Sequence, residues 1–501
     1  MRAYVPLALL TLALLGVRLA SAIAVAQPGY TDAYYYAGVA GRLARGEGLT
    51  ADFVWNYLEA PGFAALPVAS HRFWMPLASL LQAAGIALAG GPLGDFRAAQ
   101  AAVIAVAAAI PIATFAVARA LAAKPLAALA AAAIAGLGGA LAPAWVSLDS
   151  FAPAALIGTL FFLALGRAAA GDLRAGLAAG VLVGLLYLAR AEGALFGLAL
   201  IWLALRPASR GAGLAGAAVA LAIGAAWLAR GAALGLPGDL VARAVLLVRY
   251  EDFFALEPPS LAAFLASPAD VLAARAGALL VNATTAAVTL LLVPLVPLAV
   301  AARRRWARPD VRVFVALAAG VYLVQSLVFA PHAVRGSWFH SIASLFPFAV
   351  ALAAAGSDDL FASAGRALAR TVAGVSVAAF GIVSVFAVGQ WDVDFNTPYR
   401  ARLAAVPLLP DGPVVAADAA AWRWVSGRPA VLAPADGERA ASCAAQVYGA
   451  AALVLESAHF SAYGDLYTAQ RSDIFTLRAE AGGIRLYAVR PDQRCVLASG
   501  P

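Results

Sequence analysis

The sequence has little charge for its length. Only 12% of its 501 residues are Asp, Glu, Lys or Arg, whereas 63% are hydrophobic, and the mean hydropathy is +0.85. This balance excludes a water-soluble globular protein, which needs a polar surface to face water. We therefore expect lipid to be the main solvent of the chain.

Lysine is almost absent, because Lys124 is the only lysine among 35 basic residues. Arginine therefore gives the chain its formal net charge of +8. The arginines are scattered between apolar segments and form no continuous basic stripe that would follow a phosphate backbone. We expect no nucleic-acid partner and interpret the arginines as markers of membrane topology.

Cysteine is also scarce. The two cysteines, Cys443 and Cys495, both lie in the polar C-terminal tail. Structural disulfides form in oxidising compartments. If the tail lies outside the cytoplasm, the sequence predicts a disulfide between these two residues.

Apolar windows of about 20 residues, the length that crosses a bilayer, recur from Val5 to Gly389 and stop after Gln390. Arginine-rich short loops lie on the cytoplasmic side of membranes, and one alternation places all of them there. It predicts a cytoplasmic N-terminus, about eleven transmembrane helices and an external C-terminus in the cell membrane. The expected spans are residues 5–26, 97–118, 125–143, 151–166, 175–189, 192–205, 212–229, 276–302, 312–330, 340–356 and 370–389.

Two apolar segments need a separate interpretation. The first, Val5 to Ala26, is too long for a signal peptide and lacks a small-residue cleavage site, so we expect a retained helix. The segment from Phe73 to Gly90 would place Arg119 and Lys124 outside if it crossed the membrane. We expect it to be an interfacial helix on the outer surface.

The chain is expected to form two domains. Residues 1–390 make an all-α polytopic membrane domain with an external first loop at residues 27–94, and residues 391–501 make a small extracytoplasmic α/β domain. The second expectation rests on short strand-like runs that alternate with helix-compatible stretches. These runs are residues 413–417, 430–433, 452–455 and 484–489.

The first external loop carries the most distinctive motifs. Asp32 follows the first span by a few residues and precedes three consecutive tyrosines, a Gly-Glu-Gly turn comes next, and the run from His71 to Leu77 ends in Pro-Leu at the expected interfacial helix. This arrangement resembles the GT-C superfamily of membrane glycosyltransferases. Within it, the bacterial branch related to protein mannosyltransferases and aminoarabinose transferases, the family 39-like branch, is the most similar.

The resemblance extends over most of the membrane region through looser motifs. They are Asp149 in the second external turn, the run from Leu188 to Gly193, and the run from Arg335 to His340 before an apolar helix with Pro347. Two features depart from the family pattern. Ala33 stands where many members have a second acid, and only Pro76 remains of the usual pair of prolines.

The resemblance implies an activity and its site. Members invert the anomeric centre of a sugar as they move it from a polyprenyl-phosphate donor, and their first-loop aspartate is the catalytic base, which matches Asp32. The aspartate of the second external loop matches Asp149. The acceptor is expected to be a lipid, glycan or protein at the external face of the membrane. The expected partners are therefore membrane lipid, the lipid-linked sugar donor and that acceptor.

Physical chemistry supports the same residue types. A carboxylate must take the acceptor hydroxyl's proton as the glycosidic bond forms. The phosphate leaving group is stabilised by arginine at the membrane surface. The candidate substrate-binding residues are Tyr35, His71, Arg72, Arg190, Glu192, Arg335 and His340.

Structural alternatives remain for several of these residues. Asp32 and Asp149 each precede a helix-like run and are residues that commonly cap helices. Arg190 and Glu192 lie between apolar segments, where ionisable groups pair with one another or face a polar cavity. His71, His332 and His340 have no metal-ligand spacing, which favours hydrogen-bonding roles over the alternative of a divalent metal site. The polyprenyl-phosphate sugar is expected as the donor substrate.

Two other classes of function compete with a glycosyltransferase. A transporter or flippase typically has inverted repeats with broken helices and mid-membrane charges, whereas here the acidic residues gather in external loops and no repeat is evident. A non-catalytic membrane assembly protein would keep the scaffold and use its tail to bind a partner. Such a protein would keep its function when Asp32 is substituted.

Overall fold

The computed structural model describes residues 4–60, 62–235, 240–257, 259–292, 294–362 and 365–490, together with Cys495. The chain forms two compact units, each assembled from three separate stretches of sequence. The helical unit comprises Met1–Ala26, Trp74–Ala233 and Arg275–Trp391, and the sheet unit comprises Gln27–Phe73, Leu234–Ala274 and Asp392–Pro501. The predicted domain boundary after residue 390 stays a prediction; two earlier segments group with the tail in the sheet unit.

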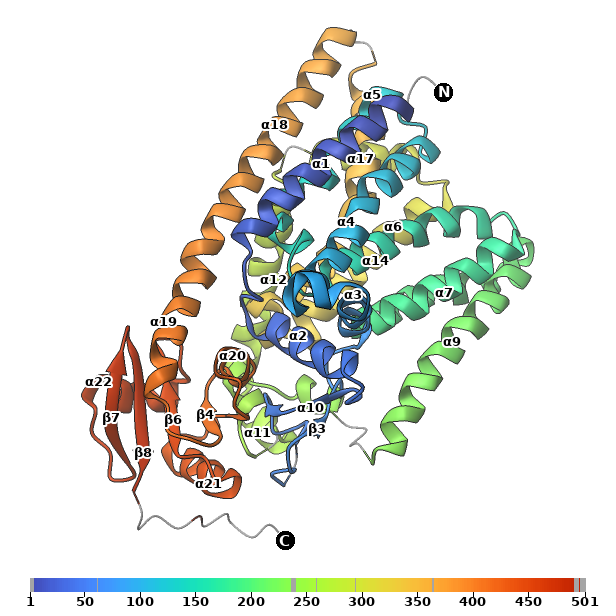
Figure 1. Cartoon of the computed structure of the whole chain (residues 1–501). Helices are drawn as coiled ribbons and strands as arrows, with labels where there is room; N and C mark the ends of the chain where they lie inside the picture. The colour runs from blue at the N-terminus through green and yellow to red at the C-terminus, as the bar shows by residue number, and fades with distance from the viewer. Residues whose placement is uncertain are drawn as a thin grey trace. The chain divides into compact units, whose positions relative to one another are not determined.

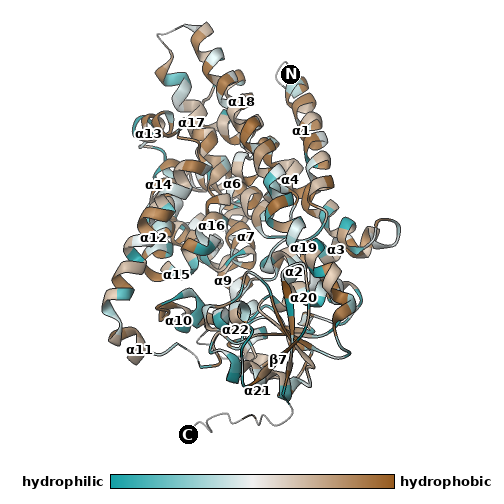
Figure 2. Cartoon of the chain, turned by 90° about the vertical axis from the view of Figure 1, so that its left-hand side faces the viewer, coloured by the Kyte–Doolittle hydropathy of each residue, from teal (hydrophilic) through white to brown (hydrophobic). Residues whose placement is uncertain are grey.

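The helical unit consists of apolar helices rich in alanine, leucine and glycine. Figure 2 shows that hydrophobic residues predominate along α1 and α18. Its helices are α1 (Tyr4–Ala24), α3 (Leu77–Leu93), α4 (Asp95–Ala120), α5 (Pro125–Leu137), α6 (Phe151–Ala168), α7 (Leu173–Ala189), α8 (Gly197–Ala204), α9 (Arg210–Ala233), α12 (Pro268–Thr289, whose first residues belong to the other unit), α13 (Leu295–Arg304), α14 (Pro309–Leu323), α15 (Ala330–His332), α16 (Trp338–Ala343), α17 (Phe346–Leu360) and α18 (Arg366–Trp391).

Fewer helices than expected are long enough to cross a bilayer alone. Among the described residues, seven helices are long and apolar enough to cross a membrane, or up to eight if the bent pair Ala330–Ala343 and Phe346–Leu360 is one span. Several expected spans are shorter helices, and the expected span 276–302 is divided between α12 and α13. A helix as short as α5 rises only about 20 Å, against a hydrocarbon core of about 30 Å.

Small residues let the helices of this unit approach closely. Figure 1 shows α7 and α9 running side by side. A Cβ atom on Gly180 of α7 would lie 2.2 Å from the carbonyl oxygen of Gly216 of α9. In the same way, a Cβ atom on Gly85 of α3 would lie 2.6 Å from the carbonyl oxygen of Ala98 of α4. Glycine is therefore required at these helix contacts.

The chain leaves helical geometry after α5 and reaches Asp149 through two 3-10 turns. Gly138 ends α5 with a φ of +84°, a conformation that glycine adopts without strain. Three side chains from three other elements then satisfy the last carbonyls of α5, which have no partner within the helix. Trp145 donates to the Ala135 oxygen at 3.2 Å, Arg18 to the Gly136 oxygen at 3.2 Å and Ser384 to the Leu137 oxygen at 3.0 Å.

The sheet unit contains a six-stranded sheet in the order β2-β5-β4-β6-β8-β7. The first four are parallel to one another, and β8 pairs antiparallel with both of its neighbours, β6 and β7. Its strands are β2 (Phe53–Val54), β4 (Val414–Ala416), β5 (Ala430–Leu432), β6 (Ala452–Leu455), β7 (Phe475–Ala481) and β8 (Ile484–Val489), and the short pair β1 (Thr50–Ala51) and β3 (Val68–Ala69) lies apart from this sheet. Its helices are α2 (Thr31–Ala44), α10 (Leu240–Val245), α11 (Leu261–Ala266), α19 (Thr397–Ala405), α20 (Ala419–Ser426), α21 (Glu438–Tyr448) and α22 (Gly464–Ala469).

The predicted fold class, a helical polytopic membrane domain followed by a small α/β domain, is confirmed. The sequence did not indicate that the first loop would add an edge strand to the tail's sheet. Phe53 and Val54 of β2 pair with Ala430 and Val431 of β5. The α/β domain is therefore completed by residues from the other end of the chain.

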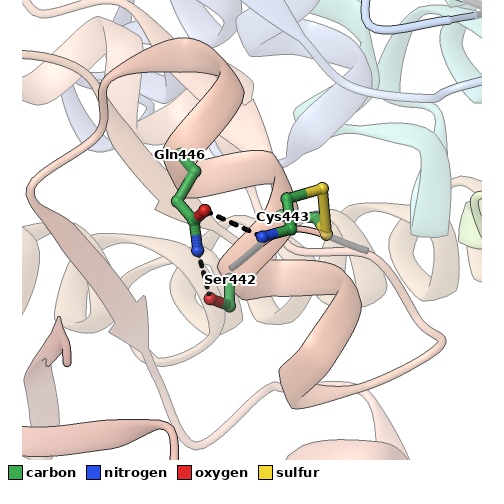
Figure 3. Close-up of a disulfide and its surroundings, with 4 residues drawn as sticks. Ser442, Cys443 and Gln446 are labelled. Carbon is green, nitrogen blue, oxygen red and sulfur yellow. Dashed lines mark hydrogen bonds between the residues drawn. A yellow bond between two sulfur atoms is a disulfide. The ribbon is translucent and has the colours of Figure 1, made fainter. Parts of the chain in front are cut away.

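The predicted disulfide between Cys443 and Cys495 is also confirmed (Figure 3). Cys443 lies on α21, and the backbone N–H of Cys495 donates to the side-chain oxygen of Gln446 at 3.0 Å. The side-chain nitrogen of Gln446 donates to Ser442 at 3.1 Å. The disulfide and these hydrogen bonds fix Cys495 on α21.

Candidate functional site

Asp149 and His340 form a buried pair in the helical unit. The side chain of Asp149 is 0% exposed, and its Oδ2 lies 2.9 Å from Nε2 of His340. The other carboxylate oxygen accepts hydrogen bonds from the backbone N–H and the hydroxyl of Ser150. The imidazole also stacks on Phe151, with ring centroids 4.0 Å apart. Two residues that are 191 positions apart in sequence thus share one buried site.

The hydrogen bonds of His340 limit its protonation. Its Nδ1 lies 3.0 Å from the carbonyl oxygen of Gly336, which can only accept, so Nδ1 carries a hydrogen. The hydrogen between Nε2 and Asp149 then belongs either to an imidazolium facing a carboxylate or to a carboxyl facing a neutral imidazole. The pair can therefore hold one proton at a defined position.

An irregular segment presents His340. Residues Ala333–Ser337 form a π-helix, and Gly336 has a φ of +118°, where a residue with a side chain would be strained. π-helical turns are frequent at functional sites. Arg335 lies on this same segment and is exposed, so the structure does not place it in the buried pair.

Arg190 and Glu192 make the ion pair that the sequence left as an alternative to substrate binding. Nε of Arg190 lies 2.5 Å from Oε1 of Glu192, which also accepts from the hydroxyl of Ser341 at 2.6 Å. Ser341 follows His340 directly in α16. Gln325 donates to Ser341 at 3.1 Å, and Arg190 donates to Ser337 at 3.4 Å. The pair is thus part of a hydrogen-bond network beside the Asp149 and His340 site.

Sequence reasoning included Ser337 only as a member of the run from Arg335 to His340, and it missed Ser341 and Gln325. Ser337 and Ser341 are four residues apart and so lie on one face of the helical segment. The available signal was the presence of polar residues close to His340 within an otherwise apolar helical segment. Single serines in such helices usually bond to their own backbone, so the signal is weak by itself.

Asp32 lies in the first turn of α2, in the sheet unit, and is partly exposed. The capping alternative is not supported, because α2 begins at Thr31, its N-cap is Tyr30, and the cap side chain makes no hydrogen bond. A carboxylate in a first turn is stabilised by the helix dipole. The N-cap of α6 is likewise Ser150, which leaves Asp149 outside the capping position.

Tyr35, His71 and Arg72 also lie in the sheet unit. The hydroxyl of Tyr35 accepts from the backbone N–H of His71 at 2.5 Å, and the His71 ring stacks on Tyr36 with centroids 5.9 Å apart. Tyr35 and His71 are buried, whereas Arg72 is partly exposed. The structure brings these three predicted residues together, and their role in substrate binding stays a prediction.

Glu59 is a buried carboxyl group that sequence reasoning missed. It is 3% exposed and accepts from Trp55 Nε1 at 2.5 Å and from the backbone N–H of Phe73 at 2.6 Å. Its backbone carbonyl accepts from Arg72. Burial raises the pKa of Glu59 to about 7, although these hydrogen bonds and the charge of Arg72 act in the opposite direction. No motif marks Glu59 in the sequence.

Within the helical unit, Asp149 and His340 supply two ligand atoms of types that bind divalent metals. The expectation of a site without metal stays a prediction.

Comparison with protein-family models and with curated proteins finds no match. Comparison with solved structures finds ArnT from Cupriavidus metallidurans in the apo state, with a TM-score of 0.57 and 16% identity over 97% of both chains. ArnT bound to undecaprenyl phosphate matches with a TM-score of 0.55 and 14% identity over 98% of both chains. The archaeal oligosaccharyltransferase AglB from Archaeoglobus fulgidus, in complex with an inhibitory peptide and a dolichol-phosphate, matches with a TM-score of 0.53 and 13% identity over 97% of this chain and 75% of that one.

At these identities the similarity concerns the fold, and it extends over nearly the whole chain. The resemblance that the first-loop motifs indicated is therefore confirmed at the level of architecture. The chain is a multi-pass membrane protein with the GT-C glycosyltransferase fold.

Proposed function

We propose that the protein is an inverting glycosyltransferase. It moves a sugar from a polyprenyl-phosphate donor to a lipid, glycan or protein acceptor at the external face of the cell membrane. The observation that carries the proposal is the fold shared with ArnT over 97% of both chains. That ArnT binds undecaprenyl phosphate and AglB binds a dolichol-phosphate supports a polyprenyl-phosphate donor here.

Asp32 acts as the general base in this proposal. Its place in the first turn of α2 is one where the helix dipole favours a negative charge, and its side chain is partly exposed. It takes the hydroxyl proton while the acceptor oxygen attacks the anomeric carbon, and the lipid phosphate leaves from the opposite side. One base is sufficient for this single step, because phosphate is a stable leaving group.

The remaining predicted residues bind the substrates. Arg72 and Arg335 are partly or fully exposed and would face the donor phosphate, whose charge increases as it leaves. Arg190 is neutralised by Glu192, so this pair suits the hydroxyl groups of a sugar better than a phosphate. His340 and Asp149, the second proposed catalytic residue, would hold a proton beside the sugar. Tyr35 and His71, which bond to each other next to Arg72, complete the proposed set of substrate-binding residues.

The orientation belongs to the same proposal, with the N-terminus in the cytoplasm and the tail outside. The disulfide between Cys443 and Cys495 supports an oxidising environment for the tail. A reporter that is active only in the cytoplasm, fused after Pro501, should stay silent. Activity of that fusion would contradict the orientation.

Profiling of lipid-linked sugars in a deletion strain tests the function. We expect a polyprenyl-phosphate sugar to accumulate and one glycan or modified lipid to be lost, and a plasmid copy of the protein to reverse both changes. Unchanged lipid-linked sugars and envelope glycans would contradict the proposal. Loss of a glycan without accumulation of its donor, together with full rescue by Asp32→Asn, would favour a transporter or an assembly protein.

A further inference from the structure

The helix that carries Asp32 is anchored by residues from the far end of the chain. Before α2, the side-chain oxygen of Gln27 accepts from the backbone N–H of Gly29 at 2.6 Å and from the hydroxyl of Tyr34 at 2.5 Å. The side-chain nitrogen of Gln27 donates to Asn396 at 3.1 Å. Asn396 lies more than 360 residues further along the chain, so the N-terminal end of α2 is tied to the tail.

A buried ion pair of the tail lies against the same end of α2. The guanidinium carbon of Arg402, on α19, lies 6.0 Å from the ring centroid of Tyr34. Nε of Arg402 lies 3.1 and 3.0 Å from the two carboxylate oxygens of Glu456, and Trp422 donates to Glu456 at 2.7 Å. Arg402 is 8% exposed and Glu456 is 9% exposed. Arg402 and Glu456 are therefore held in fixed positions, with Arg402 next to the ring of Tyr34.

Tyr34 is the residue of α2 that contacts this ion pair. It is 1% exposed, and its ring lies 6.2 Å from the ring of Trp424, which belongs to α20. Figure 1 labels α2, α19 and α20, and α2 packs along α20. Tyr34 is two residues from Asp32 in the first turns of the helix. A rotation or shift of Tyr34 would therefore move the carboxylate of Asp32 with it.

The C-terminal end of α2 is anchored in a second way. Arg42 pairs with Asp52 at 3.2 Å, and the same carboxylate oxygen of Asp52 lies 2.7 Å from Arg423 of α20. Asp52 directly precedes β2, the strand that joins the tail's sheet. Both ends of α2 are thus linked to the tail by charged or hydrogen-bonded side chains.

We propose that the tail is a positioning element for α2, and that Arg402 and Glu456 are positioning residues that fix Asp32 through Tyr34. The inference rests on the proposed function, in which Asp32 is the base. Removing one partner of a buried ion pair leaves an uncompensated charge, which the structure relieves by moving. A displacement of about 1 Å of a reacting group lowers a catalysed rate by roughly 10²-fold.

The test compares Arg402→Met with Arg485→Met in full-length protein in lipid nanodiscs. Arg485, whose side chain is 17% exposed, pairs with Glu480 on the β7 and β8 hairpin and lies over the ring of Tyr467. Among the described residues its ion pair is with Glu480 and not with α2. We expect amide hydrogen exchange in residues 34–41 to be about tenfold faster in Arg402→Met and unchanged in Arg485→Met. In Arg402→Met, exchange in β7 and β8 should stay as in the wild type. This result would distinguish a displaced α2 from an unfolded tail.

Activity gives the second readout. The deletion strain is complemented with each variant, and undecaprenyl phosphate is the binding probe for the purified proteins. We expect Arg402→Met to lower the transfer rate by roughly 10²-fold and to keep the affinity for undecaprenyl phosphate within about twofold. If Arg402→Met loosens the whole tail, Tyr34→Phe decides, because it keeps the ring beside Arg402 and removes the hydroxyl, which bonds to Gln27 and interacts with Arg402. We expect Tyr34→Phe to slow transfer by about three- to tenfold.

The outcomes separate the two proposals. Wild-type exchange in α2 and wild-type transfer by both Arg402→Met and Tyr34→Phe would overturn the positioning role if Asp32→Asn abolishes transfer. Full transfer by Asp32→Asn would instead overturn the role of Asp32 and with it the proposed function.

Discussion

The helical unit and the sheet unit each contain an ion pair, and the two pairs differ in how far apart their partners lie in the sequence. In the helical unit, Arg190 and Glu192 are two residues apart, although the serines that they bond to, Ser337 and Ser341, lie 147 and 149 residues further along the chain. In the sheet unit, Arg402 reaches Glu456 across 54 residues and Arg423 reaches Asp52 across 371. Local links of the first kind can be recognised from sequence spacing, whereas links of the second kind exist only after the chain has folded.

The largest effect on stability is expected from the disulfide, which crosslinks the sheet unit alone. Replacing Cys443 and Cys495 with serine opens a loop of 52 residues. For such a loop the chain-entropy estimate is a loss of about 4 kcal/mol. Amide hydrogen exchange in β4, β6 and β8 at increasing denaturant should show this loss, and treatment of the wild type with a reducing agent should reproduce it. An equal loss of stability in the helical unit would contradict the claim that the disulfide stabilises the sheet unit alone.

Glu59 is expected to make the stability of the sheet unit depend on pH. Its folded-state pKa of about 7 lies above the ordinary value of 4.5, so the folded protein favours the protonated carboxyl. The contribution of protonated Glu59 to the free energy of unfolding is fully present below about pH 4.5. It is lost as the pH rises through 7, and the loss is at most about 3 kcal/mol. Glu59→Gln cannot ionise, so its stability relative to the wild type should increase over this range. Parallel pH profiles for the two proteins would contradict the assignment.

The smallest effect concerns a local cap of the helical unit. Asp172 is the N-cap of α7, and its carboxylate accepts from the backbone N–H of Ala175 at 3.1 Å. Asp172→Ala should lower the midpoint of thermal unfolding, whereas Asp172→Asn keeps a capping oxygen and should be nearly neutral. Thermal unfolding of the two variants in the same detergent measures the difference. Equal losses would show that the surface ion pair with Arg167, at 3.1 Å, matters more than the cap.

The same contrast explains what the sequence could predict. Hydropathy and arginine placement were sufficient for a polytopic helical domain, and strand-like runs with two cysteines were sufficient for an α/β tail with a disulfide. The two-residue strand at Phe53 was out of reach, because its only signal is its pairing with Ala430, nearly 380 residues later. The span count differed because Pro, Gly and polar turns divide apolar windows into helices shorter than a bilayer.

The residues of the candidate site also fall into those that the sequence indicated and those that only the folded structure shows. Asp32 and Asp149 were found because each lies at a recognisable distance from an apolar span, and His340 because it ends a motif. Glu59 and Arg402 were missed because a carboxylate or guanidinium in a polar segment is usually solvated. Their burial is a property of the folded sheet unit, in which the first loop and the tail enclose them.

The most direct test of the central claim is the transfer rate of purified Asp32→Asn protein. The donor is the polyprenyl-phosphate sugar that accumulates in the deletion strain, and Asp95→Asn, which removes a first-turn carboxylate from α4, is the matched control. Without its general base the enzyme should be slower by roughly 10² to 10⁴-fold, a barrier increase of about 3 to 5 kcal/mol, while the control keeps its rate. A near wild-type rate for Asp32→Asn would contradict the account.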